Sequence, residues 1–417
     1  MSISNVLVTG AGGFIGGRVA HRIALGEEYS VTALVHTLGG AGTMRVGRLP
    51  VDIEQGSILD SERMSEVLKS CDAVVNCAHG DAEVTVDGTR TLLEATEAQG
   101  IDSYIHLSSA VVHGHDASGR ITEQTPLAPD TDYAKQKARA EEIVKDWDGS
   151  LQPTIFRPCI VYGPHSPWVK TPLREVQQGA VIAGRGVGDV NQVYIDNLVD
   201  AILCALEEPT AEGEIFEIAD DEPITWREYY ESLGQLCDGH PPTQYVTLSE
   251  LELRKKLRTG RDSIVPPVRL ATEILTAPET LQRTATHLQQ TPWAPALYRR
   301  LPPTLQTAVK DRIATPTDGT PGNDGTAPEP RYEYPPENVA LLQSTSGHID
   351  TQKAKTMLDW QPRVSFDEAM EYIAAWARYE ELVDGNEAAT EQRREPNEDE
   401  DENRTQASDS IAVPTDR

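Results

Sequence analysis

A tyrosine and a lysine four residues apart suggest acid–base chemistry. The segment TDYAKQKARAEEIV, residues 131–144, places Tyr133 and Lys137 on one face of an expected helix, because residues i and i+4 are neighbours there. A phenol with a pKa of about 10 is a poor base at neutral pH. We expect the neighbouring ammonium to stabilise the phenolate and lower the pKa of Tyr133, so that proton exchange with a substrate hydroxyl becomes feasible.

Two serines at the end of an expected strand could assist this chemistry. They lie in HLSSAVVHG, residues 106–114, and either Ser108 or Ser109 could donate a hydrogen bond to the same substrate oxygen. Taken singly, a Tyr/Lys pair is usually a solvated helix face, and strand-end serines usually cap a turn. The order along the chain, a glycine loop, then the serines, then Tyr-x-x-x-Lys, favours a catalytic interpretation.

The glycine loop lies in LVTGAGGFIGGRVAHRI, residues 7–23, between an expected strand at 5–9 and an expected helix from Phe14 to Leu25. A helix N-terminus presents unpaired N–H groups and a partial positive charge, and glycines let a pyrophosphate approach the backbone. Gly10, Gly13 and Gly16 have the spacing and context of a dinucleotide-binding loop. A plain tight turn is the weaker alternative.

The end of the second expected strand bears on the choice between NAD and NADP. NAD-binding chains usually have Asp or Glu there to bind the ribose 2′-hydroxyl, whereas this chain has Val35-His36-Thr37. A carboxylate that would repel a 2′-phosphate is absent from these three positions, and His36, Arg45 and Arg48 are possible partners for one. The sequence slightly favours NADP and leaves both cofactors open.

Alternating apolar and amphipathic segments position these residues. Strands are expected at 5–9, 30–36, 73–77, 103–108 and 153–157, and helices at 14–25, 61–70, 87–99 and 132–147, with a further strand and helix in 193–208. Repeated βα units predict an α/β fold, a Rossmann-like doubly wound parallel sheet with a smaller, mostly helical C-terminal substrate domain.

The domain prediction follows from where this regularity weakens. Residues 1–165 are expected to bind the dinucleotide, with 193–218 returning to that domain. Residues 166–192 and 219–380 are expected to bind substrate. The Gly/Pro-rich segment 313–332 predicts a mobile loop, and the acidic segment 381–417 predicts a disordered tail.

Composition narrows the class of protein. The 417 residues carry a net charge of −29, and 27 of the 37 basic residues are Arg. This predicts a halophilic, haloarchaeal type of surface and argues against nucleic-acid binding. The five cysteines are widely spaced and predict free thiols. Since there is no apolar run of membrane-spanning length and no signal-like N-terminus, we expect no membrane association and a cytoplasmic location.

With these features placed, the chain resembles the extended short-chain dehydrogenase/reductase superfamily, in particular its NAD-dependent epimerase/dehydratase branch. The likeness covers roughly residues 3–235 and 349–376. The motifs that carry it are VTGAGGFIG (8–16), DAVVNCA (72–78), DGTRTLLEA (87–95), SSAVVHG (108–114), YAKQK (133–137), RPCIVYGP (157–164), VYIDNLVDAI (193–202) and DTQKAKTMLDWQPRVSFDEAM (350–370).

The resemblance implies roles for individual residues. It implies that Tyr133 is the catalytic acid/base, Ser109 the catalytic Ser/Thr, and Lys137 the residue that holds the nicotinamide ribose and tunes Tyr133. It also implies cofactor contacts at Gly10, Gly13, Phe14, Ile15, Gly16, His36, Ser57, Ile58, Ala78 and Pro158. A homodimer with NAD or NADP and a small-molecule substrate is expected, without a metal, since His79, His113 and His115 lack ligand spacing.

Several positions depart from the family pattern. Asn76 replaces a common His, Asp87 a common Asn, Ser57 an adenine-binding Asp, and His113 the Tyr of V-Y-G. The Asn that often precedes V-Y-G-P is Ile160, and Val190-Asn191-Gln192 lacks the basic residue often found there. Ala110-Val111 follow Ser109 where 4,6-dehydratases have Asp-Glu. The last departure disfavours a dehydratase.

Three functions stay open on these residues. The leading hypothesis is epimerisation of a nucleotide sugar through hydride removal from a secondary alcohol. The alternative is a dehydrogenase or reductase of a sterol-like or other hydroxy/keto compound, which Ile160 and the YIDN form of the later motif favour. A non-catalytic nucleotide-binding protein is the third, although Tyr133 and Lys137 are both retained.

Overall fold

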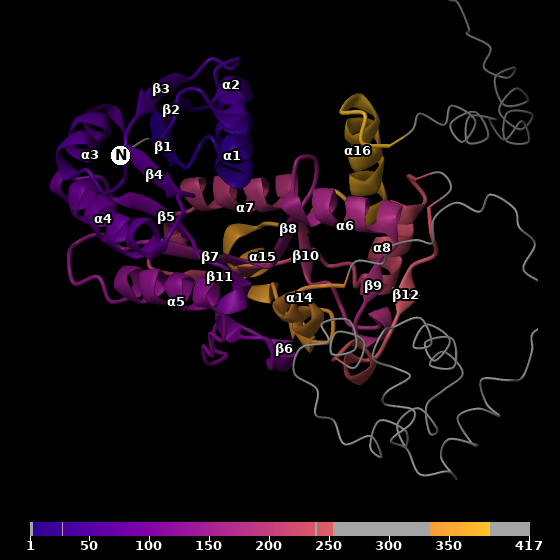
Figure 1. Cartoon of the computed structure of the whole chain (residues 1–417). Helices are drawn as coiled ribbons and strands as arrows, with labels where there is room; N and C mark the ends of the chain where they lie inside the picture. The colour runs from indigo at the N-terminus through magenta and orange to yellow at the C-terminus, as the bar shows by residue number, and fades with distance from the viewer. Residues whose placement is uncertain (1–2, 27, 238–239, 253–333, 384–417) are drawn as a thin grey trace, which may run out of the picture.

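A seven-stranded sheet forms the centre of the computed structural model, which describes residues 3–26, 28–237, 240–252 and 334–383 (Figure 1). Its order is β11-β7-β5-β4-β1-β2-β3, and every pair is parallel. The strands are β1 (Asn5–Thr9), β2 (Ser30–Val35), β3 (Asp52–Gln55), β4 (Ala73–Asn76), β5 (Ser103–Leu107), β7 (Thr154–Pro158) and β11 (Ile215–Ile218). The predicted Rossmann-like fold is confirmed.

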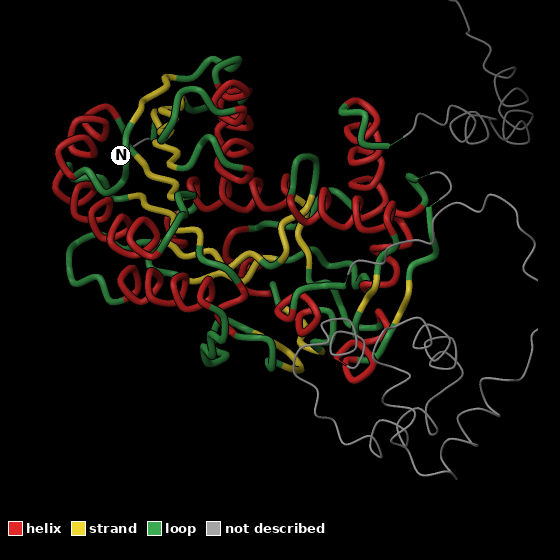
Figure 2. Tube along the Cα trace, in the orientation of Figure 1, coloured by secondary structure: helices red, strands yellow, loops and turns green. Residues whose placement is uncertain are grey.

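Helices cover both faces of this sheet, as Figure 2 shows in red around the yellow strands. They are α1 (Phe14–Leu25), α2 (Ala41–Val46), α3 (Ser61–Val67), α4 (Gly88–Ala98), α5 (Asp132–Lys145) and α7 (Ile195–Glu207). Strand β1 explains the two layers, because successive side chains of a strand point to opposite faces. Val6 and Val8 pack in the cluster that includes α1 and α7, whereas Leu7 packs in the cluster of α3, α4 and α5.

Two elements near the second strand were not predicted from the sequence. Strand β3 forms the edge of the sheet beside β2, and the short helix α2 connects them. The strand is short and its residues Asp52–Gln55 are only partly buried. A charged, half-exposed edge strand carries no apolar run, so the pattern that identified the inner strands could not identify it.

The second region begins where β7 ends. Its elements are β8 (Ile160–Tyr162), α6 (Pro167–Gln178), β9 (Val181–Ile182), β10 (Gln192–Tyr194), α8 (Trp226–Gly234), β12 (Gln244–Tyr245), α14 (Glu337–Leu342), α15 (Gln352–Leu358) and α16 (Phe366–Tyr379). Parallel pairs β10–β8 and β12–β9 lie within it, and β13 (Ser346–Ile349) pairs with β6 (Ser118–Ile121). The expected loop 313–332 and residues 384–417 of the expected tail 381–417 lie outside the described residues.

The C-terminal segment docks through one buried amide and an aromatic cluster. The Asn197 side-chain oxygen accepts hydrogen bonds from the backbone N–H groups of Arg363 and Val364, both at 2.9 Å. Phe366 packs against Tyr162 and Tyr229 with ring centroids 6.1 and 6.2 Å apart. These contacts fix the segment between α15 and α16 to α7, and the start of α16 to β8 and α8.

Candidate active site

The glycine loop has the shape that a pyrophosphate requires. Gly10 adopts φ +62°, and a Cβ there would lie 2.7 Å from the Cys77 carbonyl oxygen. A Cβ on Gly16 would lie 2.5 Å from the Gly10 carbonyl oxygen. Helix α1 starts at Phe14 after Gly13, which supplies no side-chain cap. The loop therefore leaves the first N–H groups of α1 available to an anion, and these residues fit the dinucleotide that the sequence predicts.

The predicted nicotinamide residues meet at the carboxyl edge of the sheet. Ala78 follows β4, Ser109 follows β5 and Pro158 ends β7, and these three strands are consecutive in the sheet, with β4 next to β1. The Ala78 backbone N–H lies 3.1 Å from the Thr9 hydroxyl and 3.2 Å from the Asn76 side-chain oxygen. Asn76, which replaces a common His of the family, thus holds the segment after β4 against the glycine loop.

The adenosine end of the site is more exposed. His36 and Thr37 lie on the surface after β2, with His36 Nδ1 3.3 Å from the Thr37 hydroxyl. Ser57 follows β3, and its hydroxyl accepts the Leu59 N–H at 3.2 Å. Ile58 is 4% exposed and packs against Gly88, where an added Cβ would come within 2.6 Å of it. The contact makes Ile58 part of the core as well as a predicted cofactor residue.

Helix α5 presents Tyr133 to the same edge, where it meets His79 and Ser109. The Tyr133 side chain is 44% exposed, and its ring lies edge-on to the His79 ring with centroids 5.8 Å apart. Burial of the phenol raises the pKa of Tyr133, and a hydrogen bond with the Ser109 hydroxyl partly offsets this increase. Burial, and secondarily the charge of Lys137, lowers the pKa of His79.

Lys137 behaves differently from the prediction. Its side chain is buried, its Nζ donates to the Leu107 carbonyl oxygen at 2.7 Å, and burial lowers its pKa to about 8. The prediction that this ammonium lowers the pKa of Tyr133 is wrong for this structure. Burial raises that pKa, and the group that lowers it in part is Ser109. The lysine is directed to the strand carbonyl rather than to the phenol.

The structure separates the two serines that the sequence left open. Ser108 is buried and its hydroxyl donates to Glu141 Oε2 at 2.6 Å. Ser109 caps the 3-10 turn Ala110–His113, and its hydroxyl accepts the Val111 N–H at 3.4 Å and lies 3.5 Å from the Pro158 carbonyl oxygen. It is also the serine that lowers the pKa of Tyr133. Of the two, Ser109 is therefore available to a substrate oxygen.

The sequence analysis did not identify two residues, His79 and Glu141, as part of the candidate site. His79 follows the D-x-V-x-H-x-A segment directly, and this position was the available signal. Glu141 lies one helical turn after Lys137 on the same face of α5, and its spacing was the signal. Neither residue type alone distinguishes a site residue from a surface residue.

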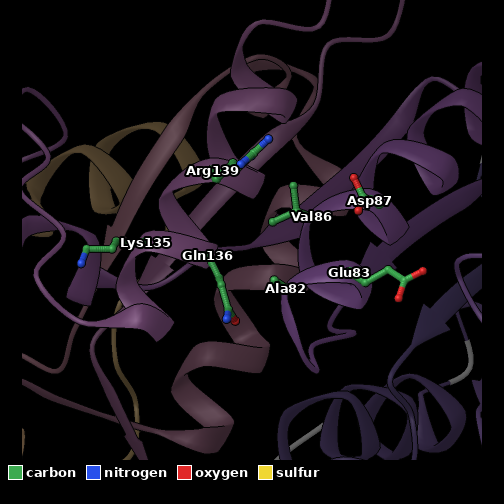
Figure 3. Close-up of a pocket in the computed structure, with 7 residues that line it drawn as sticks. All are labelled: Ala82, Glu83, Val86, Asp87, Lys135, Gln136 and Arg139. Atoms are coloured by element: carbon green, nitrogen blue, oxygen red, sulfur yellow. The ribbon is translucent and has the colours of Figure 1, made fainter.

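A surface hollow beside α5 is separate from this site. Figure 3 shows the residues that line it, which come from Ala82, the one-turn π-helix Glu83–Asp87 before α4, and α5. Lys135, Gln136 and Arg139 contribute the α5 side. Lys135 and Arg139 lie on the face of the helix away from Tyr133, whereas Gln136 lies one turn after Tyr133. Neither Tyr133 nor Lys137 lines the hollow.

The described residues contain no group of three or more His, Cys, Asp or Glu side chains that could hold a metal ion. The structure separates the three histidines considered above: His113 contacts Glu217 at 2.8 Å, His115 contacts Asp130 at 2.7 Å, and His79 contacts Tyr133. All five cysteines are free thiols. Among the helices in the described ranges, none has the length and apolar character needed to cross a bilayer.

Comparisons with known proteins agree with this geometry. The model of the NAD dependent epimerase/dehydratase family matches residues 6–219. The chain is 30% identical over 273 residues to the 2-alkyl-3-oxoalkanoate reductase of Shewanella oneidensis, covering 58% of this chain and 69% of the relative. It is 25% identical over 260 residues to the N-acetyl-alpha-D-glucosaminyl-diphospho-ditrans,octacis-undecaprenol 4-epimerase of Escherichia coli O157:H7, covering 58% and 75%.

A solved structure shows the same fold over most of the chain. UDP-glucuronic acid 4-epimerase from Bacillus cereus, in complex with UDP-glucuronic acid and NAD, aligns with a TM-score of 0.61 and 18% identity, covering 90% of this chain and 99% of that one. The glycine loop, the strand-end residues and the family match lead to one conclusion. The chain belongs to the NAD-dependent epimerase/dehydratase family of the extended short-chain dehydrogenase/reductase superfamily and is an enzyme that uses NAD or NADP.

Proposed function

We propose that this enzyme epimerises a nucleotide sugar by oxidising a secondary alcohol and reducing the resulting ketone from the opposite face. One observation carries the proposal: Tyr133 lies close enough to Ser109 for the serine hydroxyl to lower its pKa, at the carboxyl edge of the sheet that also carries the glycine loop. In parallel α/β sheets this edge is where ligands bind. A substrate hydroxyl at this pair would have both a hydrogen-bond donor and a proton acceptor.

Different residues of the chain bind the cofactor and transfer the proton in this reaction. Bound NAD or NADP supplies the hydride acceptor and donor. Gly10, Gly13 and Gly16 hold its pyrophosphate, and Ala78 and Pro158 position its nicotinamide end. Tyr133 takes the proton of the substrate hydroxyl and returns it on reduction, while Ser109 donates to the same oxygen.

Lys137 has a binding role in this scheme. Its ammonium would hold the nicotinamide ribose, and its pKa of about 8 lets it lose a proton near neutral pH. This role does not require the direct effect on the phenol that the sequence predicted.

The turn after Ser109 argues against sugar dehydration. Ala110–His113 forms one 3-10 turn in which Val112 and His113 are buried. Elimination of water needs an acid and a base of its own, and the two positions after Ser109 hold Ala110 and Val111. The proposed reaction therefore stops at oxidation and reduction.

A second candidate is a reductase of a hydroxy or keto compound without a nucleotide. The identity of 30% to the Shewanella oneidensis reductase favours it. So does the environment of Ile160 and Gln192, which are 9% and 2% exposed and supply no charge for a diphosphate. This candidate uses the same Ser109 and Tyr133.

Turnover with purified enzyme separates the candidates. An epimerase should convert UDP-sugars with retained cofactor and no net change in absorbance at the reduced-nicotinamide band. A reductase should consume added NADH or NADPH stoichiometrically with a 3-oxo acid or another ketone. Tyr133→Phe should lower either activity by about 10²–10⁴-fold. Unchanged turnover in Tyr133→Phe would contradict both.

A further inference from the structure

The loop after β4 holds an imidazole ring in a fixed place beside Tyr133. This residue, His79, lies between two anchored peptide groups. The Ala78 N–H is bonded to the two buried side chains named above, and the Gly80 N–H donates to the Thr85 hydroxyl at 3.2 Å. Thr85 is 2% exposed and belongs to the π-helix before α4. The backbone on both sides of His79 is therefore anchored, and the function proposed above assigns this residue no role.

Tyr133 is fixed through its backbone but not through burial of its ring. It is the second residue of α5, whose first turn is capped by the Thr131 hydroxyl, which accepts the Ala134 N–H at 3.1 Å. Ala134 is buried, whereas the Tyr133 side chain is exposed. Lys137, which the sequence predicts beside the phenol, donates to the Leu107 carbonyl oxygen instead. Because an exposed side chain can exchange between rotamers, contacts of the ring decide where the phenol hydroxyl lies.

The His79 ring supplies such a contact. The two ring centroids are 5.8 Å apart and the ring planes are inclined by 70°. This edge-to-face arrangement is one that aromatic pairs prefer. Among the residues that the structure describes, no second ring pairs with Tyr133. Ser109 acts at the other end of the side chain, where its hydroxyl lowers the pKa of the phenol. The ring and the hydroxyl of Tyr133 thus each have one partner.

The imidazole is suited to packing because it carries no charge at neutral pH. Partial burial, and after it the charge of Lys137, lowers the pKa of His79 from its ordinary value of 6.5, and a hydrogen bond to the Gly80 backbone offsets this decrease in part. A neutral ring adds no second cation beside the Lys137 ammonium. The effect of His79 on Tyr133 is therefore one of position.

We propose that His79 is a positioning residue that holds the ring of Tyr133 so that the phenol hydroxyl stays at Ser109. Without the imidazole, the phenol would be free to rotate away from the serine, while the glycine loop would be unchanged. The rate of the proton transfer should therefore fall more than the affinity for substrate. The part of this inference that concerns turnover rests on the proposed function.

Three substitutions at one position test the role of the ring. His79→Ala removes the ring and should lower kcat by about three- to tenfold, with KM within about twofold. His79→Phe keeps an aromatic ring and should recover most of this loss. His79→Asn keeps a polar group without a ring and should not recover it. Unchanged kcat in His79→Ala, or no recovery in His79→Phe, would overturn the proposal.

Cofactor affinity shows whether the substitutions act on the phenol. Calorimetric titration of each variant with NAD or NADP, whichever the wild-type enzyme uses, should give the wild-type affinity, because His79 acts through Tyr133. Wild-type affinity also shows that the variants are folded. A loss of affinity that parallels the loss of kcat would overturn the proposal, since His79 would then act on the cofactor.

Removal of the phenol hydroxyl separates this inference from the proposed function. In the Tyr133→Phe background, His79→Ala should lower the residual turnover by less than about twofold, because no hydroxyl is left to position. A full additional loss would overturn the proposal.

A measurement without substrate keeps the outcome decisive. In the full chain with cofactor bound and labelled histidine and tyrosine, NMR should show a nuclear Overhauser effect between the rings of His79 and Tyr133. The signal should vanish in both His79→Ala and Tyr133→Phe. Its absence from the wild type would overturn this inference whatever the turnover. If the signal is present and Tyr133→Phe turns over normally, the proposed function alone fails.

Discussion

Two buried cations near the site, Lys137 and Arg157, have opposite surroundings. The lysine is 5% exposed and its Nζ donates to one neutral acceptor, the Leu107 carbonyl oxygen. The arginine is 3% exposed and is bonded to Glu141 and Glu217. Burial without a carboxylate lowers the pKa of Lys137 to about 8, whereas the two carboxylates outweigh burial and raise the pKa of Arg157.

These surroundings decide which of the two cations can exchange a proton. A buried cation without a counter-charge can lose its proton at little cost, so it can exchange protons during a reaction. A cation fully paired with carboxylates is held in place and fixes the elements around it. In the proposed function, Lys137 and Tyr133 therefore take part in the reaction, whereas Arg157 fixes the elements around them.

Removing the paired cation should have the largest effect. Arg157→Met leaves Glu141 and Glu217 buried without their guanidinium, which should cost about 3–5 kcal/mol of folding free energy. Urea denaturation of the cofactor-free protein measures this change. A loss below about 1 kcal/mol would show that the two carboxylates do not depend on Arg157.

Removing the unpaired cation should act in the opposite direction on stability. Lys137→Met should lower activity by about 10²–10³-fold. It should also stabilise the cofactor-free protein at pH 7 by about 2 kcal/mol, since the gain from removing a buried ammonium exceeds the lost Leu107 contact. Denaturation and turnover of the same preparation measure both. A destabilised Lys137→Met protein would contradict the comparison.

The stability difference between wild type and Lys137→Met should also depend on pH. The pKa of Lys137 is about 8 in the fold against an ordinary 10.5. Between these values the unfolded chain binds a proton that the folded chain does not, so rising pH stabilises the wild type. The advantage of Lys137→Met should be full below pH 8 and vanish towards pH 10.5. Denaturation at pH 7, 9 and 10 checks this direction.

A change in the cofactor loop should have a smaller effect on stability. Gly10→Ala requires φ +62° and places its Cβ 2.7 Å from the Cys77 carbonyl oxygen. It should cost about 1–3 kcal/mol and weaken NAD binding, measured by calorimetry. Gly39→Ala is the matched control, because nothing lies within 4 Å of its Cβ. Equal cofactor affinity in the two variants would exclude the loop as the pyrophosphate site.

The outward face of α5 should respond least. Lys135→Gln and Arg139→Gln change residues that line the surface hollow of Figure 3. Their effect on stability should stay within about 0.5 kcal/mol and turnover should be unchanged. A large loss of turnover in either variant would place part of the reaction on the face opposite Tyr133.

Local patterns predicted much of the fold and of the candidate site. The strand at 5–9 and the helix from Phe14 to Leu25 have the predicted bounds, because a short apolar run followed by glycines and an amphipathic segment is a strong local signal. The edge strand Asp52–Gln55 and the helix Ala41–Val46 were not predicted, since they carry little apolar pattern. The repeated βα units predicted that the strands of the sheet are parallel.

The glycine loop, the βα order and the i, i+4 placement of Tyr133 and Lys137 could be predicted from the sequence, because they depend on residues close together in the chain. Only the tertiary structure decided that Ser109 rather than Ser108 meets Tyr133, and that Lys137 binds the Leu107 carbonyl. The partners of these groups are 24 to 33 residues away in the sequence. Which of them a buried polar group reaches depends on how the strands and helices pack around it.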